Sequence, residues 1–259
     1  MMRFRRPMDD TAHTREFAAL RERIVQGGFA LVAGTAMRPL VGPWEALADW
    51  NAFAESWNDL PLDTHLPDGH RYRRRRYATL SASAGVPGFE RQTHQPHYQG
   101  IDYNKLVGGI ERWFEPIAPH VVAGPTFHAI IAFCLRLYSP FRPQAHWHIE
   151  CHQFRIEARP DSAGLPTPEG VHRDGVDYVL VMLVDRVNIE SGTTTVHAPD
   201  GRELGSFTLA APFDAALVDD ARVMHGVTAV RPLDPARLAF RDVLVVTLRV
   251  SGATPATAR

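Results

Sequence analysis

His172 and Asp174 stand two positions apart, between a turn and an apolar run. On a β-strand, residues at this spacing leave the same face. A neutral imidazole beside a carboxylate supplies two of the three protein ligands that many metal sites need. The third ligand that we expect is His225, in the segment Val223-Met-His-Gly-Val227. Two histidines and one carboxylate on one side of a metal leave positions open on the other, which suits non-haem Fe(II) and O2 chemistry.

The residues around His172 support a metal site more strongly than the triplet His172-Arg-Asp174 does by itself. A second His-x-acid triplet, His148-Ile-Glu150, occurs in the chain, so the spacing alone is weak evidence. Proline and glycine precede His172 and favour a turn. Asp174-Gly175 is disfavoured in a strand, yet an apolar run up to Val184 follows at once. Such a local conflict is typical of functional sites.

A rival cluster of metal-binding side chains lies on the strand expected at residues 145–158. Its members share one strand face: His146, His148, Glu150 and His152. Residues six positions apart on a straight strand are about 20 Å apart, so all four cannot bind one ion. The simplest interpretation is a polar, half-exposed face. After His152 the apolar residues move to the other positions of the alternation, which predicts a bulge or a bend there.

Arg241 opens an apolar strand, where an unpaired charge is costly. A guanidinium at the end of a strand is well suited to hold a carboxylate with two parallel hydrogen bonds. The alternative is a surface ion pair with Asp242 or a glutamate. Arg237 is the second candidate for the carboxylate-binding role.

Five more arginines fall within six positions, Arg71 and Arg73 to Arg76. Either they form the solvated face of a strand, or some of them bind the carboxylate of an anionic substrate. The net charge of −1 and the pI near 6.9 argue against nucleic acid and anionic membranes as partners.

The periodicity of the chain predicts which elements position these residues. Helical spacing predicts helices over 14–26, 43–57, 105–117 and 126–138, with a short strand at 29–33. From about residue 143, alternating segments predict strands over 145–158, 176–187, 193–198, 206–210, 214–218, 223–230 and 241–250. We expect one domain over 1–259, mainly β with flanking helices: a helical part at 14–140 and a jelly-roll core, the type that includes cupins, at 143–252.

Composition is ordinary for a globular protein, with 45% hydrophobic and 22% charged residues. No apolar run reaches the roughly 18 residues of a membrane span. The basic start, Met1 to Arg6, lacks the apolar region of a secretory signal. The chain has two cysteines, Cys134 and Cys151, too few for a disulfide scaffold. A cytoplasmic location is therefore expected.

Several of these stretches together resemble the bacterial 2-oxoglutarate/Fe(II) dioxygenases of the L-isoleucine hydroxylase type. The resemblance spans about residues 60–250. It rests on Pro166-Thr-Pro-Glu-Gly-Val-His-Arg-Asp-Gly175, Arg222-Val-Met-His-Gly-Val-Thr228, Arg241-Asp-Val-Leu-Val-Val246, Arg73-Arg-Arg-Arg-Tyr77 and Gly108-Gly-Ile-Glu-Arg112. One departure is Asn188-Ile-Glu-Ser-Gly192, where the family tends to have Asn-Ile-x-Gly-Gly.

The resemblance implies a double-stranded β-helix core, with His172, Asp174 and His225 as iron ligands. Arg241, or else Arg237, would hold the distal carboxylate of 2-oxoglutarate. With Fe(II), 2-oxoglutarate and O2, such an enzyme hydroxylates a small substrate, typically a free aliphatic L-amino acid, and releases succinate and CO2. Some relatives oxidise the sulfur of methionine instead. Two alternatives remain open: a cupin-like metal-binding protein without oxygenase activity, and a zinc hydrolase on the same ligands.

Overall fold

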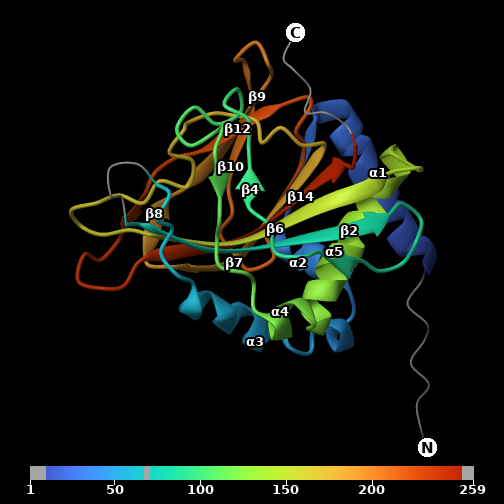
Figure 1. Cartoon of the computed structure of the whole chain (residues 1–259), viewed down its shortest axis with the longest axis horizontal. Helices are drawn as coiled ribbons and strands as arrows, with labels where there is room; N and C mark the ends of the chain where they lie inside the picture. The colour runs from blue at the N-terminus through green and yellow to red at the C-terminus, as the bar shows by residue number, and fades with distance from the viewer. Residues whose placement is uncertain (1–9, 67–70, 253–259) are drawn as a thin grey trace, which may run out of the picture.

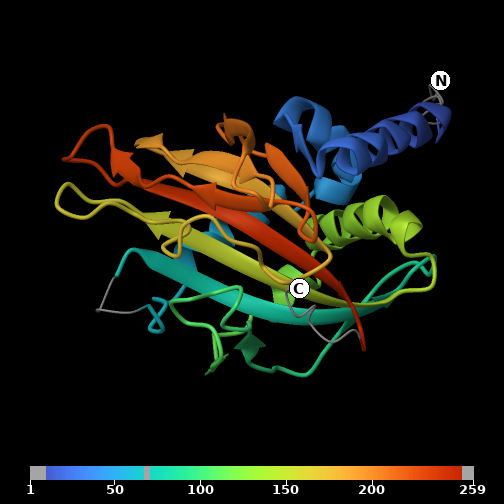
Figure 2. The ribbon, with the colours of Figure 1, turned by 90° about the horizontal axis from the view of Figure 1, so that it is seen from above.

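A large antiparallel sheet organises the protein in the computed structural model, which describes residues 10–66 and 71–252. The basic segment Met1 to Arg6 lies outside the described residues. In spatial order the strands are β1 (Phe29–Val32), β11 (Ala215–Asp219), β7 (Tyr178–Val187), β14 (Phe240–Val250), β6 (His146–Glu157), β2 (Arg73–Ser83) and β3 (Glu90–Arg91). Figure 2 shows the long strands β2, β6, β14 and β7 side by side.

Smaller sheets accompany the large one. One contains β10 (Glu203–Thr208), β9 (Thr193–His197) and β12 (Met224–Val227). Two pairs follow: β13 (Val230–Pro232) with β8 (Ile189–Ser191), and β4 (His97–Tyr98) with β5 (Glu111–Arg112). Figure 1 shows β9, β10 and β12 at the top of the molecule and the helices along its right and lower sides. The strands predicted after residue 143 are therefore confirmed, with small shifts of their ends.

The helices cover one face of the large sheet. They are α1 (Asp10–Gly27), α2 (Gly34–Val41), α3 (Trp50–Glu55), α4 (Pro119–Val122) and α5 (Pro125–Tyr138), with 3-10 turns η1 (Trp44–Leu47), η2 (Ser56–Asp59) and η4 (Ser139–Phe141). Apolar residues at helical spacing, such as Phe17 on α1 and Ile130 on α5, share one core with Trp147, Ile149 and Cys151 of β6. Strand alternation then sends the intervening residues of β6 to the opposite face. The predicted helices at 14–26 and 126–138 are confirmed.

Two helix predictions were wrong. The segment 43–57 is broken into η1, α3 and the start of η2, and at the break Asp49 accepts hydrogen bonds from the backbone and hydroxyl of Thr126. The segment 105–117 forms turns and the strand β5 instead of a helix. There the Asn104 side chain accepts hydrogen bonds from the N–H groups of Leu106 and Val107, so it competes with helical pairing.

The part predicted to be mainly helical also contributes strands. β1, β2 and β3 precede residue 140 and pair into the same sheet as the later strands. β2 pairs with β6 along eleven residues, from Arg73 opposite Ile156 to Ser83 opposite His146. The bulge predicted after His152 was wrong, because β6 keeps one register with both β2 and β14. No helix among the described residues is long and apolar enough to cross a membrane.

Candidate metal centre and its cavity

His172, Asp174 and His225 come together, as the sequence predicts. The Nε2 atom of His172 lies 3.5 Å from one oxygen of Asp174, and Nε2 of His225 lies 3.6 Å from the other. Ligands at right angles on a metal, with bonds of about 2.1 Å, would be about 3 Å apart. Each histidine nitrogen therefore lies about half an ångström beyond this spacing from one oxygen of Asp174, and the donor atoms of all three residues lie within 4.8 Å of one another.

The reason for this proximity differs from the prediction, because His172 and Asp174 do not lie on a strand. β7 begins only at Tyr178, and His172 joins β12 through an isolated antiparallel bridge to His225. Asp174 sits in a turn held by the buried carboxylate of Asp220, which accepts the N–H groups of residues 174, 175 and 176. The turn needs glycine at Gly175, where φ is 80° and a Cβ would lie 2.7 Å from the ring of Tyr103.

The protonation states of His225 and Asp174 suit metal binding. Burial lowers the pKa of His225 to about 4, so this imidazole is neutral at pH 7. Burial alone would raise the pKa of Asp174, but its hydrogen bond to His172 and the charges of both histidines lower it below its usual range. Nδ1 of His172 lies 3.0 Å from the carbonyl of Gly170. Donation there leaves Nε2 as the ligand atom, the usual outer contact of a metal-binding histidine.

His172 carries the proton that a metal would replace. Burial would lower its pKa, but the hydrogen bond to Asp174 and the charges of Asp174 and Glu169 raise it to about 9. Without a metal, this imidazolium lies between two carboxylates, with Glu169 at 3.3 Å. A divalent cation can replace this proton, and its binding would release the proton and add one positive charge beside the two carboxylates.

A cavity of about 280 Å³ opens beside the three residues. Its floor is the face of the large sheet opposite the helices. Alternate residues of β14 and β6 line it, and the antiparallel register sets Arg241 opposite Ile156 and Thr247 opposite Glu150. Six residues of strand span about 20 Å, so Arg241 and Glu150 mark opposite ends of the floor.

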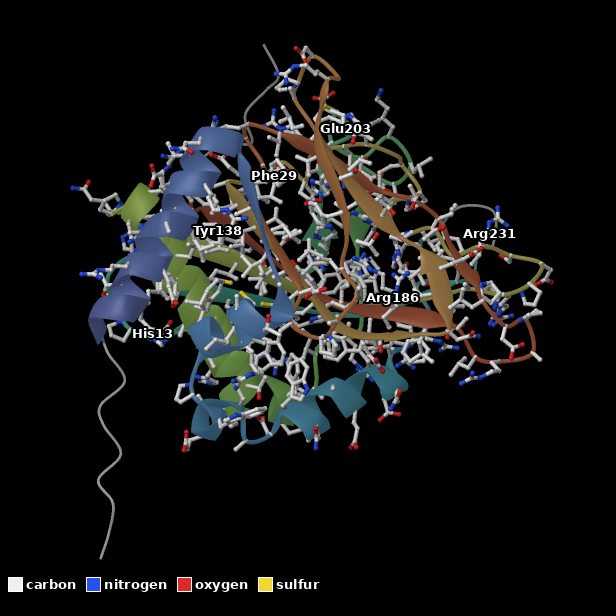
Figure 3. All side chains as sticks on the ribbon, turned by 180° about the vertical axis from the view of Figure 1, so that it is seen from behind. His13, Phe29, Tyr138, Arg186, Glu203 and Arg231 are labelled. Atoms are coloured by element: carbon white, nitrogen blue, oxygen red, sulfur yellow. The ribbon has the colours of Figure 1, made fainter. Side chains whose placement is uncertain are left out.

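Arg241 is a buried cation with free hydrogen-bonding capacity. It is 2% exposed, and its Nε and Nη2 atoms have no hydrogen-bond partner among the described residues. Burial and the nearby Arg186 lower its pKa to about 10, so it remains charged at pH 7. Arg186, labelled in Figure 3, donates to the carbonyls of Ile189 and Ser191 and cannot neutralise Arg241. Asp242, the other partner considered from the sequence, binds Arg155 instead.

Arg237, the second choice for this role, lies elsewhere. It is exposed in the turn between β13 and β14 and does not line the cavity. The buried position of Arg241 follows from its place on the sheet face opposite the helices. Arg237 has no such position, because the strand starts only at Phe240.

The rival cluster lines the same cavity, but with a different membership. His146 is exposed at the start of β6, while His97 from β4 joins Glu150 and His152. Ligand atoms of these three residues lie within 4.8 Å of one another. Sequence reasoning missed His97, because it lies in a stretch of turn-forming residues without any strand pattern.

Internal partners already occupy the rival cluster. Glu150 lies 2.8 Å from the hydroxyl of Tyr77 and 3.1 Å from Nδ1 of His97. Nδ1 of His152 lies 2.7 Å from a guanidinium nitrogen of Arg75. Burial, with the charge of Arg75 contributing, lowers the pKa of His152 to about 3, so Nδ1 is an acceptor for that guanidinium. A cation fixed beside the cluster opposes the binding of a second, metal cation.

The arginine run divides between the two faces of β2. Arg74 pairs with Glu157, and Arg76 donates to the carbonyls of Asp59 and Pro116, so both face away from the cavity. Arg73 and Arg75 line the cavity and are buried. Arg71 is exposed, so the interpretation as a solvated face fits Arg71, Arg74 and Arg76. The interpretation as carboxylate-binding groups applies only to Arg73 and Arg75.

The chain is similar to known proteins in sequence and in fold. The family model described as 2OG-Fe dioxygenase matches residues 54–247. A crystal structure of a bsmA homologue from Methylobium petroleophilum PM1 is 36% identical, with a TM-score of 0.82, covering 93% of this chain and 96% of that one. No curated protein matches the chain significantly.

Two less similar crystal structures share the fold. IDO from Bacillus thuringiensis is 18% identical with a TM-score of 0.76, covering 91% of this chain and 99% of that one. The Fe(II)/α-ketoglutarate-dependent dioxygenase TqaL is 22% identical with a TM-score of 0.73, covering 96% and 93%.

A mostly antiparallel fold with a His/Asp/His group and a buried arginine in one cavity defines a non-haem iron oxygenase. The chain belongs to the 2OG-Fe dioxygenase family. It is an oxidoreductase that uses Fe(II), 2-oxoglutarate and O2.

Proposed function

We propose that His172, Asp174 and His225 bind the Fe(II) and that Arg241 binds the distal carboxylate of 2-oxoglutarate. The enzyme hydroxylates a small substrate, a free aliphatic L-amino acid, and releases succinate and CO2. One observation carries the proposal: a fully buried, unpaired guanidinium lines the same cavity as the His/Asp/His group. Leaving such a charge unpaired is costly, and a carboxylate ligand removes the cost.

The His172 group fits iron better than the His97 group does. Its donor atoms face one another, and no arginine or lysine among the described residues forms an ion pair with its three side chains. In the rival cluster Arg75 uses the Nδ1 atom of His152, and Tyr77 binds Glu150. The His172 group also has the arrangement of two histidines and one carboxylate that leaves positions open for a co-substrate and O2.

Each part of the chain then has a defined task. Bound iron with 2-oxoglutarate and O2 supplies the oxidising power for an unactivated C–H bond. Arg241 fixes the co-substrate with a planar fork that matches a carboxylate. Val181, Val243 and Val245 make the lining apolar between Arg241 and the metal group, which excludes water from the reaction. We interpret the large sheet and the sheet of β12 as a double-stranded β-helix, because both line this cavity.

An anaerobic titration tests the proposal. Fe(II) added to the metal-free protein should bind one equivalent, and 2-oxoglutarate should then produce the visible charge-transfer band of a chelate. A screen of free L-amino acids, including methionine for sulfur oxidation, should identify a substrate by its succinate release. Stoichiometric iron without any response to 2-oxoglutarate would favour the cupin-like metal-binding protein. Activity that prefers zinc and needs no O2 would favour the hydrolase.

A further inference from the structure

The cavity contains a second buried group of cations, separate from Arg241. Arg112 on β5 is 2% exposed, and its Nε and Nη2 atoms have no hydrogen-bond partner among the described residues. Arg75 on β2 is 3% exposed, and its Nε atom likewise has no partner there. Both guanidinium groups lie against the ring of Phe114, with their central carbons 3.6 Å (Arg75) and 5.9 Å (Arg112) from its centre. Both arginines therefore lie near one aromatic ring and line the same cavity.

The surrounding carboxylates each have another partner. Asp63 binds Arg73 at 2.7 Å and lies 3.8 Å from Arg75, so one acid serves two arginines. The Glu150 carboxylate contacts Tyr77 and His97, and Glu169 lies 3.3 Å from Nε2 of His172. Burial and the charge of Arg73 lower the pKa of Arg112. Buried guanidinium groups with open donors are costly for stability alone, so they point to a ligand.

Arg75 and Arg241 enter the cavity from different strands of the large sheet. β6 lies between β2 and β14, so the backbones of Arg75 and Arg241 are separated by two strand spacings, about 10 Å. Arg112 reaches the cavity from outside the large sheet, on the β4–β5 pair that lies in front of β2 and β6 in Figure 1. The cavity thus has open guanidinium donors on both sides of the central strand β6.

We propose that Arg75 and Arg112 form a substrate-carboxylate site, which makes the enzyme specific for small acids with a free carboxylate. The inference rests on the proposed function, because it assigns the second anion of the same iron site. Arg112 supplies the planar fork, since both Nε and Nη2 are open and can donate in parallel. Arg75 adds its open Nε and is held in place by His152 and Asp63.

Substitution of Arg112 tests the site by turnover. The variants are Arg112→Met and Arg112→Lys, with Arg76→Met as the control because Arg76 faces away from the cavity. Each is assayed with the best amino acid from the screen and with its α-amide. Wild type should accept the acid and reject the amide. Arg112→Met should raise the KM for the acid at least tenfold, Arg112→Lys should restore part of it, and the KM for 2-oxoglutarate should not change. An amide accepted as well as the acid, or an unchanged KM in Arg112→Met, would overturn the assignment.

A binding measurement separates this inference from the proposed function. Crystals of wild type and of Arg112→Met, loaded with Mn(II) and N-oxalylglycine, are soaked in iodide. An anomalous peak in contact with Arg75 and Arg112 that is absent from the variant supports the site. If Mn(II) and N-oxalylglycine bind at His172 and Arg241 but no iodide lies between the two arginines, the inference fails alone. If N-oxalylglycine itself binds at Arg75 and Arg112, both assignments are wrong. If neither Mn(II) nor N-oxalylglycine binds, the proposed function fails, and the iodide peak alone then decides whether the two arginines form an anion site.

Discussion

His172 and His225 are joined by a reciprocal pair of backbone hydrogen bonds. The N–H of each residue donates to the carbonyl of the other, both at 2.9 Å. Their imidazole rings lie 4.8 Å apart, centre to centre. The two histidines therefore form one unit, although 52 residues separate them along the chain, and the third side chain of the group has to be positioned independently.

Removal of the Asp174 carboxylate should abolish metal binding. Asp174→Ala deletes the only anion that contacts both histidines in the described part of the chain, and it should lose stoichiometric Fe(II) and all turnover. Equilibrium dialysis with an iron assay measures this directly. His148→Ala is the control, since His148 lines the same cavity but lies outside both metal-capable groups. Stoichiometric iron retained in Asp174→Ala would overturn the assignment of the metal to the His172 group and would favour the rival cluster.

The turn that carries Asp174 should depend on Asp220. Its two oxygens accept three consecutive backbone N–H groups, and an amide in their place offers only one accepting oxygen. Asp220→Asn should weaken Fe(II) binding by about tenfold to a hundredfold, as for other outer contacts of metal ligands, with the fold retained. Asp200→Asn, which alters one exposed turn hydrogen bond, serves as the control. Unchanged iron affinity in Asp220→Asn would mean that the turn is held by other contacts.

Arg241 should control the affinity for 2-oxoglutarate. Two charge-assisted hydrogen bonds are at stake, each worth about 1.5–3 kcal/mol before non-additivity. Arg241→Leu should therefore raise the Kd for 2-oxoglutarate by about tenfold to several hundredfold, while Fe(II) affinity stays the same. Arg241→Lys should recover only part of the loss, because a point charge replaces a planar fork. The exposed Arg237→Leu is the matched control, and a change there in place of Arg241→Leu would contradict the assignment.

Acid should destabilise the protein partly through His152. Its pKa is about 3 when folded and about 6.5 when unfolded. A base whose pKa is lowered by folding stabilises the protein fully above the unfolded value, and this stability is lost as pH falls from about 6.5 toward 3. The loss from this residue alone is about 1.4 kcal/mol per pH unit. Urea unfolding between pH 7 and 4.5 measures it, and His152→Gln should show a flatter decline. An equally steep decline in the variant would assign the acid sensitivity to other groups.

The sequence predicts the metal group better than its surroundings. The sequence alone shows that four polar residues conflict with the apolar pattern around them. They lie next to turns or at the starts of strands: His172, Asp174, His225 and Arg241. The sequence does not show why these residues lie close together, because this depends on the bridge between His172 and His225 and on the hydrogen bonds of Asp220.

The substrate side of the cavity could be predicted least. Arg112 and His97 lie in short strands of two residues each, which have no periodicity to detect. The helix predicted at 105–117 placed Arg112 in the wrong element altogether. In contrast, the strand β6 is long enough for alternation to separate the core face from the cavity face correctly, except for the bulge that the structure lacks.

The β4–β5 pair has a consequence for how this enzyme can diverge. It brings His97 and Arg112 to the cavity from a segment that pairs only two residues on each side. The proposed iron ligands and Arg241 lie on other elements, the turn before β7, β12 and β14. The same segment also contacts the turn of Asp174, because Gln99 donates to the carbonyl of Asp174 and a Cβ at Gly175 would meet the ring of Tyr103. Single substitutions at His97 or Arg112 can therefore change the lining of the cavity, whereas exchange of the whole segment would also disturb the turn that carries a proposed iron ligand.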